Sequence, residues 1–187
     1  MDLREHSTAL VSVIIGLGLT ELLGNLHRLI RAGSLVRWYG LPVLWAVYAL
    51  LVAVIFWWAV YLGSLGVMVA DNTFHFLVHL ASPLLAYLVC ASALPTVEPG
   101  RTLDMRVAYY SGARYFFGIS AAYIACTALI GNLQAGGFEW STLNAIRLSL
   151  FALFVALLWV RSERFHWFAA VAVLLLLSYR MTIQVLR

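Results

Sequence analysis

Residues 42–65 read PVLWAVYALLVAVIFWWAVYLGSL, a stretch without an Asp, Glu, Lys or Arg. An α-helix rises 1.5 Å per residue, so about 20 apolar residues cross the roughly 30 Å of hydrocarbon in a bilayer. A soluble domain of this chain length has no interior large enough for several such helices. The segment therefore predicts a membrane-spanning helix.

Five further stretches have the same character, and they cover residues of about 7–30, 72–94, 107–133, 142–160 and 165–186. Gly33, Pro95 and the pair Gly136-Gly137 mark breaks between them, and Pro42 suits the first turn of its helix. Because the connections are short, we expect a single transmembrane domain over residues 1–187. The fold class is all-α: a polytopic membrane protein with a bundle of about six transmembrane helices.

The composition agrees with this prediction and excludes two classes of function, retinal binding and nucleic-acid binding. The chain is 64% hydrophobic and 11% charged, with a mean hydropathy of +0.93, whereas soluble domains are nearer half apolar and a quarter charged. All 12 basic residues are arginines, so no lysine is present to form a Schiff base with retinal. The arginines stand singly at segment ends, which is not the basic patch of a nucleic-acid-binding protein.

The arginines also predict orientation, because cytoplasmic loops carry the excess of positive charge. The first, third and fifth connections carry arginines, and the second and fourth have none. With six crossings, both termini are expected outside the cytoplasm, in the inner (cytoplasmic) membrane. The deciding residues are Arg31, Arg37, Arg101, Arg106, Arg161 and Arg164.

Aromatic residues gather at the expected ends of the helices, as in the interfacial belts of membrane proteins. The belt would include Trp38-Tyr39, Trp57-Trp58, Tyr61, Tyr109-Tyr110, Trp140, Trp159 and Trp167.

The two halves of the chain share short matches in the same order. Residues 20–27 (TELLGNLH) resemble residues 127–134 (TALIGNLQ), residues 48–53 (YALLVA) resemble 151–156 (FALFVA), and 74–76 (FHF) resemble 165–167 (FHW). Halves of three helices each would have opposite orientations, so the matches favour a 3+3 inverted repeat, a construction common in transporters. The alternative is that leucine-rich helices align by chance.

Ionisable residues inside a span cost about 2.5–3.5 kcal/mol each on insertion scales, so they normally face protein or water and often mark function. Starting one residue before the stretch 72–94, Asp71, His75 and His79 recur every four residues and share one helix face with Ser82. Pro83 leaves the carbonyl of His79 without its helical hydrogen bond. This face is the predicted ion or proton path.

Two other interpretations of the same face stay open. His75 and His79 are spaced to share a metal ion, with His6 as a further candidate ligand, and a haem held by two histidines would need a second helix. Alternatively, Asp71 caps its helix and the histidines simply hydrogen-bond to neighbours. The identity of any metal is unknown, and no cofactor is required by the sequence.

A second charged group lies towards the cytoplasmic side of the first and fourth helices. We expect Glu21 and Arg114 to form a buried pair between the helices, because either charge alone would be costly. Asn25 supports Glu21 on the same face, and Arg147 on the fifth helix is placed to neutralise Asp71.

Small residues recur at four-residue spacing on the first helix, at Ser12, Gly16, Thr20 and Gly24. Such a series lets helix backbones approach closely. We expect it to pack in the core, with contact to a second protomer as the alternative.

No catalytic motif is present, so the chain is not expected to be an enzyme: Gly-x-Ser-x-Gly, His-Glu-x-x-His and phosphate-binding glycine loops are all missing. Two functions remain. The first is a small transporter or channel for protons, ions or a small solute along the third helix. The second is a non-catalytic accessory or assembly subunit of a larger membrane complex. The expected surroundings are the lipid bilayer, with a homo-oligomer or a larger complex as the form of assembly.

Overall fold

The computed structural model describes residues 3–61, 73–98 and 100–185, and these contain six α-helices. In chain order the helices are α1 (Leu3–Ala32), α2 (Gly40–Tyr61), α3 (Thr73–Ser92), α4 (Met105–Gln134), α5 (Thr142–Trp159) and α6 (Glu163–Val185). Their bounds agree with the predicted stretches to within a few residues. A short 3-10 turn, η1 (Gly33–Leu35), follows α1.

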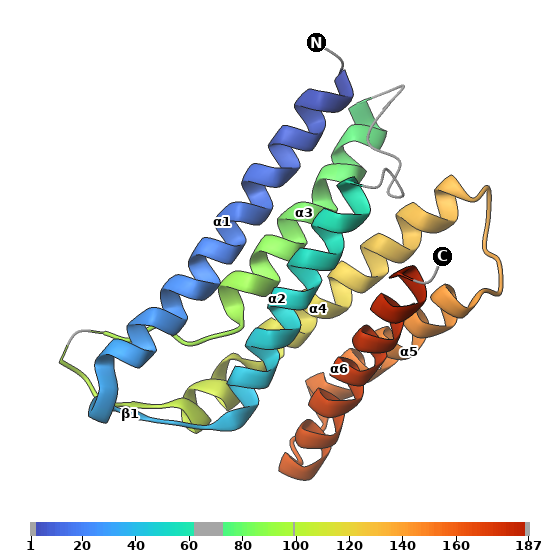
Figure 1. Cartoon of the computed structure of the whole chain (residues 1–187). Coiled ribbons are helices and arrows are strands. Elements are labelled where there is room, and N and C mark those ends of the chain that lie inside the picture. The colour runs from blue at the N-terminus through green and yellow to red at the C-terminus, as the bar shows by residue number, and fades with distance from the viewer. Residues whose placement is uncertain (1–2, 62–72, 99, 186–187) are drawn as a thin grey trace.

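The helices pack side by side in the order α1–α3–α4–α5–α6–α2, and α2 closes the ring against α1 (Figure 1). Helix α2 also contacts α3 and α4, and it is the most enclosed of the four helical segments that could cross a membrane. A helix that is apolar on every side is expected at such a position. Residues 42–61, which belong to the stretch that predicts the fold, therefore lie at the centre of the bundle.

Among the described residues, four helical segments are long and apolar enough to cross a membrane: Thr8–Leu35, Gly40–Tyr61, Met105–Gln134 and Thr142–Trp159. A shorter apolar segment, Leu77–Ser92, lies within α3. The chain is thus a multi-pass helical membrane protein.

The first, third and fifth connections meet at one end of the bundle (Figure 1). Two of them form a short parallel pair of strands, β1 (Val36–Arg37) and β2 (Leu103–Asp104), which the sequence analysis did not predict. At the opposite end of the bundle, α4 ends at Gln134, shortly before Gly136 and Gly137, which have φ of +78° and +155°. Glycine tolerates these values because it has no Cβ.

The two halves of the chain do not pack alike. In the first half α1 lies mainly along α3, whereas in the second half α4 lies mainly along α5. The proposed internal repeat therefore receives no support from the helix packing.

The small-residue series on α1 does not make the close contact that was expected of it. A Cβ added to Gly16 would meet nothing within 4 Å, whereas one added to Gly18 would lie 3.2 Å from the Cα of Tyr87 on α3. A strict four-residue repeat turns about 40° per step, at 100° per residue, and so winds away from a straight contact face. The glycine that matters is Gly18, which lies outside the predicted series of Ser12, Gly16, Thr20 and Gly24.

This difference gives a paired prediction. Gly18→Leu should lower the free energy of unfolding by about 1–3 kcal/mol, because the side chain has no room against the backbone of α3. Gly16→Leu, with the same gain in helix propensity, should change it by less than about 0.5 kcal/mol. Unfolding in a graded mixture of mild detergent and dodecyl sulfate would measure both. Equal losses would contradict the assigned contact.

Candidate functional site

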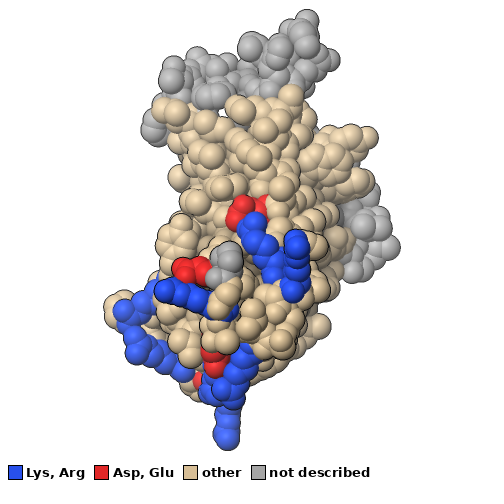
Figure 2. Space-filling model, turned by 90° about the vertical axis from the view of Figure 1, so that its left-hand side faces the viewer, with Lys and Arg blue, Asp and Glu red and all other residues tan. Residues whose placement is uncertain are grey.

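Charged side chains gather at the end of the bundle where the three arginine-bearing connections meet, and Figure 2 shows them over the lower half of one face. Asp104 caps α4 by accepting hydrogen bonds from the backbone N–H groups of Arg106 (2.9 Å) and Val107 (3.3 Å). Asp104 also pairs with Arg37 at 3.5 Å. The sequence thus folds locally into a capped helix start that holds the first and third connections together.

Glu163, at the start of α6, ties the fifth connection to the same end. Its carboxylate accepts hydrogen bonds from the hydroxyl of Tyr39 (2.9 Å) and the guanidinium of Arg106 (2.6 Å). Arg106 also lies 5.8 Å from the centre of the Tyr39 ring. Burial and the neighbouring Tyr110 and Glu163 raise the pKa of Tyr39, so this hydroxyl stays protonated and donates.

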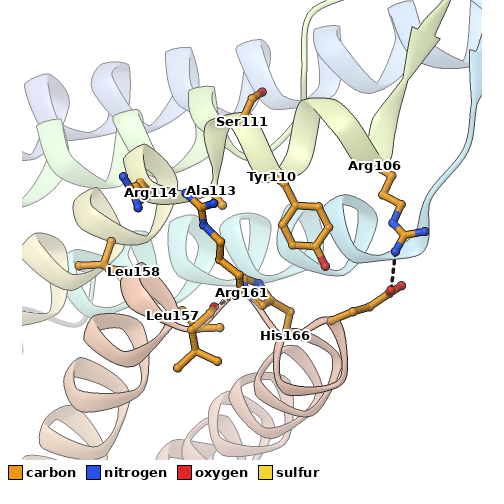
Figure 3. Close-up of a pocket in the computed structure, with 11 residues that line it drawn as sticks. Arg106, Tyr110, Ser111, Ala113, Arg114, Leu157, Leu158, Arg161 and His166 are labelled. Carbon is orange, nitrogen blue, oxygen red and sulfur yellow. Dashed lines mark hydrogen bonds and ion pairs between the residues drawn. The ribbon is translucent and has the colours of Figure 1, made fainter.

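A cavity of about 580 Å³ opens beside this cluster (Figure 3). Arg106, Tyr110 and Arg114 line it from α4, while Arg161 extends toward it from the α5–α6 connection and His166 forms part of its inner wall. Three guanidinium groups and the single carboxylate of Glu163 leave the lining with a clear excess of positive charge. This volume falls within the usual range of small-ligand sites, roughly 300–1,000 Å³.

A chain of buried hydrogen bonds leads inward from the cavity. The Tyr109 hydroxyl lies 2.6 Å from Nδ1 of His166 and accepts from Nε1–H of Trp45 at 3.1 Å. Nε2 of His166 lies 2.9 Å from the carbonyl oxygen of Val160. A carbonyl only accepts, so His166 donates from Nε2 and Nδ1 accepts from Tyr109. A neutral imidazole thus satisfies every partner.

Aromatic rings fill the bundle beyond this chain. Trp45 packs against Tyr48, Phe116, Phe117 and Phe154, with ring centres 5.0–5.9 Å apart. Trp45 is 1% exposed, and Tyr48, Phe117 and Phe154 are fully buried. The cluster closes the centre of the bundle.

A second polar group lies at the other end of α4 and α5. The amide of Asn144 donates to Oδ1 of Asn132 at 2.8 Å, and Arg147 donates to Asn144 at 3.2 Å. Arg180 on α6 and Tyr123 on α4 lie within electrostatic range of Arg147. The structure thus brings together polar residues that the sequence placed on three separate helices.

The predicted path on α3 is only partly within the described residues. Asp71 and the side chains of His6 and His75 lie outside them. The half-buried His79 lies 3.3 Å from Gln134. The pairing of Asp71 with Arg147 stays a prediction, as does a metal site at His6, His75 and His79. Among the described side chains, no cluster of three or more His, Cys, Asp and Glu residues is placed to hold a metal ion.

After His79 in the sequence, the same face of α3 is packed against neighbouring helices. Ser82 is 3% exposed and lies 3.3 Å from the sulfur of Cys126, while Pro83 is buried. Further along, Cys90 is 1% exposed and donates to the carbonyl of Ala49. The polar groups in this part of the face are paired within the protein, so packing explains them.

The structure does not bring Glu21 and Arg114 together. Glu21 lies 3.3 Å from Arg28, and Asn25 also bonds to Arg28, at 2.6 Å. Arg114 lies instead at the cavity between α4 and the α5–α6 connection. The reason is the packing order: α3 lies between α1 and α4, so similar depths of Glu21 and Arg114 along their helices do not bring them into contact.

The sequence analysis missed the residues that connect the cavity to the core. Tyr109 was expected in the interfacial belt but is 8% exposed, and His166, at 2%, was noted only in the repeat. One signal was available, because His166 is an ionisable residue inside an apolar stretch, the criterion that selected His75 and His79. Nothing in the spacing of residues along the sequence shows that Tyr109 faces His166.

Helix length, apolar composition and clustered charge at one end define the class: a multi-pass helical membrane protein with a basic cavity at one end of its bundle. Comparison with protein-family models, with curated proteins and with solved structures finds no significant match.

Proposed function

We propose that this protein crosses the membrane six times as a single transmembrane domain and carries a small polar solute between α2, α4, α5 and α6. The arginine-rich end faces the cytoplasm, in accordance with the positive-inside rule, and both termini lie on the other side. The cavity beside Arg106 and Arg114 is the cytoplasmic entrance. This route differs from the one expected along α3, which stays a prediction because Asp71 and the side chain of His75 lie outside the described residues.

The observation that carries this proposal is a buried polar seam along α4. Tyr109, Ser120, Tyr123 and Thr127 all lie on its buried face, from the cavity to the neighbourhood of Arg147. Within the bilayer, buried polar groups are costly and usually functional. On this face Tyr109 and Thr127 form hydrogen bonds within the protein, whereas Ser120 Oγ has no hydrogen-bond partner among the described residues.

Besides the Tyr110 hydroxyl at the cavity, four buried polar atoms on α2, α4, α5 and α6 have no hydrogen-bond partner among the described residues: the Tyr48 hydroxyl, Ser120 Oγ, Arg147 Nε and Arg180 Nε. A buried polar group without a partner costs about 1–3 kcal/mol, so a purely structural core has no reason to keep them. In a carrier such groups meet the solute when the closed aromatic cluster opens. The structure then represents a form in which the aromatic cluster closes the route between the cavity and the opposite end of the bundle.

The test removes the two unpaired hydroxyl groups with Tyr48→Phe/Ser120→Ala. Stability should stay the same or rise, because the two neighbouring hydroxyls are removed together and neither is left as an unsatisfied partner of the other. Uptake of inorganic phosphate, chloride or sulfate into proteoliposomes should fall severalfold if the seam conducts. Tyr115→Phe/Ser149→Ala removes the same groups from exposed positions of α4 and α5 and should leave uptake unchanged.

The carrier proposal fails if wild-type proteoliposomes take up these anions no faster than empty vesicles. It also fails if both double variants transport equally well. Thermal unfolding of each variant in detergent shows whether a change in uptake reflects folding.

A second function, the accessory subunit, is favoured by the uncovered face of α1. Gly16 is exposed, and nothing lies within 4 Å of the position of its Cβ. Small-residue faces of this kind let membrane helices pack closely. Purification in a gentle detergent would show unrelated membrane subunits that migrate with the chain, and Gly16→Leu should release them.

A further inference from the structure

We propose that the cavity between α4 and the α5–α6 connection binds a phosphate-bearing anion, either a lipid headgroup or a soluble phosphate. This inference deepens the proposed function by naming the ligand class of its cavity. It concerns binding alone, so it can hold or fail independently of transport.

The charges of the cavity are only partly neutralised by the protein itself. Glu163 is engaged by Arg106 and Tyr39. Arg114 and Arg161 form no ion pair with a carboxylate in the part of the chain that the structure describes. Two guanidinium groups therefore line one cavity without a counter-charge. In Figure 3 Arg161 reaches from the connection toward the helix that carries Arg114.

The geometry suits phosphate better than a small spherical ion. A guanidinium presents its N–H groups as a planar fork that binds two phosphate oxygens at once. The Tyr110 hydroxyl adds a neutral donor: it is buried at the cavity near the Tyr39 hydroxyl but has no partner in hydrogen-bonding geometry among the described residues. Two charged forks and a neutral hydroxyl at one cavity are the kinds of donor from which a phosphate group accepts hydrogen bonds.

The position also suits the ligand. Arg106 and Arg114 are eight residues apart on α4, so the cavity extends about 12 Å along the helix at 1.5 Å per residue. At the cytoplasmic end of the bundle, basic pockets between helices meet the headgroups of anionic lipids. The same opening admits a soluble phosphate from the cytoplasm.

Binding is measured on the purified full chain with two probes. Inorganic phosphate is tested by thermal stabilisation in detergent, with chloride at equal ionic strength as reference. Phosphatidylglycerol is tested by native mass spectrometry of protein from mixed micelles, with phosphatidylcholine as reference. Stabilisation by phosphate identifies a soluble ligand, and retention of phosphatidylglycerol without stabilisation by phosphate identifies a headgroup.

The decisive variant is Arg114→Gln/Arg161→Gln. Its affinity for the probe that binds should fall about tenfold or more, as expected when charge-assisted contacts are lost. Arg31→Gln/Arg164→Gln removes the same charge from exposed positions at the same end, outside the cavity, and should bind as wild type does. If the glutamine pair does not fold, Arg114→Lys/Arg161→Lys keeps the charge and should still weaken binding through loss of the forks.

The proposal is overturned if neither probe binds better than its reference. It is also overturned if the cavity and control variants lose affinity equally, because binding would then reflect the general charge of that end. Binding without uptake in proteoliposomes would remove the carrier function and leave the anion site in place.

Discussion

Replacing Trp45 with alanine should lower the free energy of unfolding by about 3–5 kcal/mol, the usual cost of truncating a large buried aromatic side chain. Trp45 touches four rings from α2, α4 and α5, and its indole N–H donates to Tyr109. In a bilayer, dispersion contacts of this kind hold helices together, because lipid is as apolar as the side chains. The cavity left by alanine would lose them outright.

Trp45→Phe separates the two contributions. It retains most of the ring contacts but removes the hydrogen bond to Tyr109, so we expect a loss of about 1–2 kcal/mol. Reversible unfolding in mixed micelles would measure both variants. If Trp45→Ala unfolds at the same denaturant concentration as wild type, the assignment of Trp45 to the centre of the bundle is wrong.

Tyr109→Phe should cost about 2–4 kcal/mol although it removes a single oxygen atom. Two buried groups lose their partner at once: the indole N–H of Trp45 and Nδ1 of His166. Each group left unsatisfied costs about 1–3 kcal/mol. The effect should therefore exceed that of Trp45→Phe.

The matched control stands next to it in the sequence. Tyr110→Phe removes a hydroxyl that has no hydrogen-bond partner among the described residues, so stability should change by less than about 0.5 kcal/mol. Both substitutions keep an aromatic ring on α4, so a difference between them reports the hydrogen bonds alone. Equal losses would show that the chain from Trp45 to His166 does not contribute to stability.

Much of the fold was accessible from the sequence. The six helices and their approximate ends follow from apolar stretches and from breaks such as Gly33, Pro95 and Gly136, because backbone groups in lipid are satisfied only within a helix. The arginines predicted which connections share a side, and the structure brings those connections to one end. These properties depend on residues near one another in the chain.

The candidate site was less accessible. The sequence selected Asp71, His75 and His79 because they are polar in an apolar stretch, but the cavity depends on how helices are rotated about their axes. Arg114 illustrates a related limit, since Glu21 was predicted as its partner from depth alone but lies on a helix that α3 separates from α4. Tyr109 illustrates it as well, because its partner His166 is 57 residues away.

The amino-acid sequence by itself determined three properties: that the chain is a membrane protein, at which residues its helices approximately begin and end, and which connections lie together. Hydropathy, helix-breaking residues and arginine placement are local properties, and they need no knowledge of the neighbouring helices. Only the tertiary structure decided that Gly18 rather than Gly16 meets another helix, and that Arg114 lines the same cavity as Arg161 instead of pairing with Glu21. Both outcomes depend on which helices are neighbours and on which face each helix turns to its neighbour, and packing among the six helices sets both.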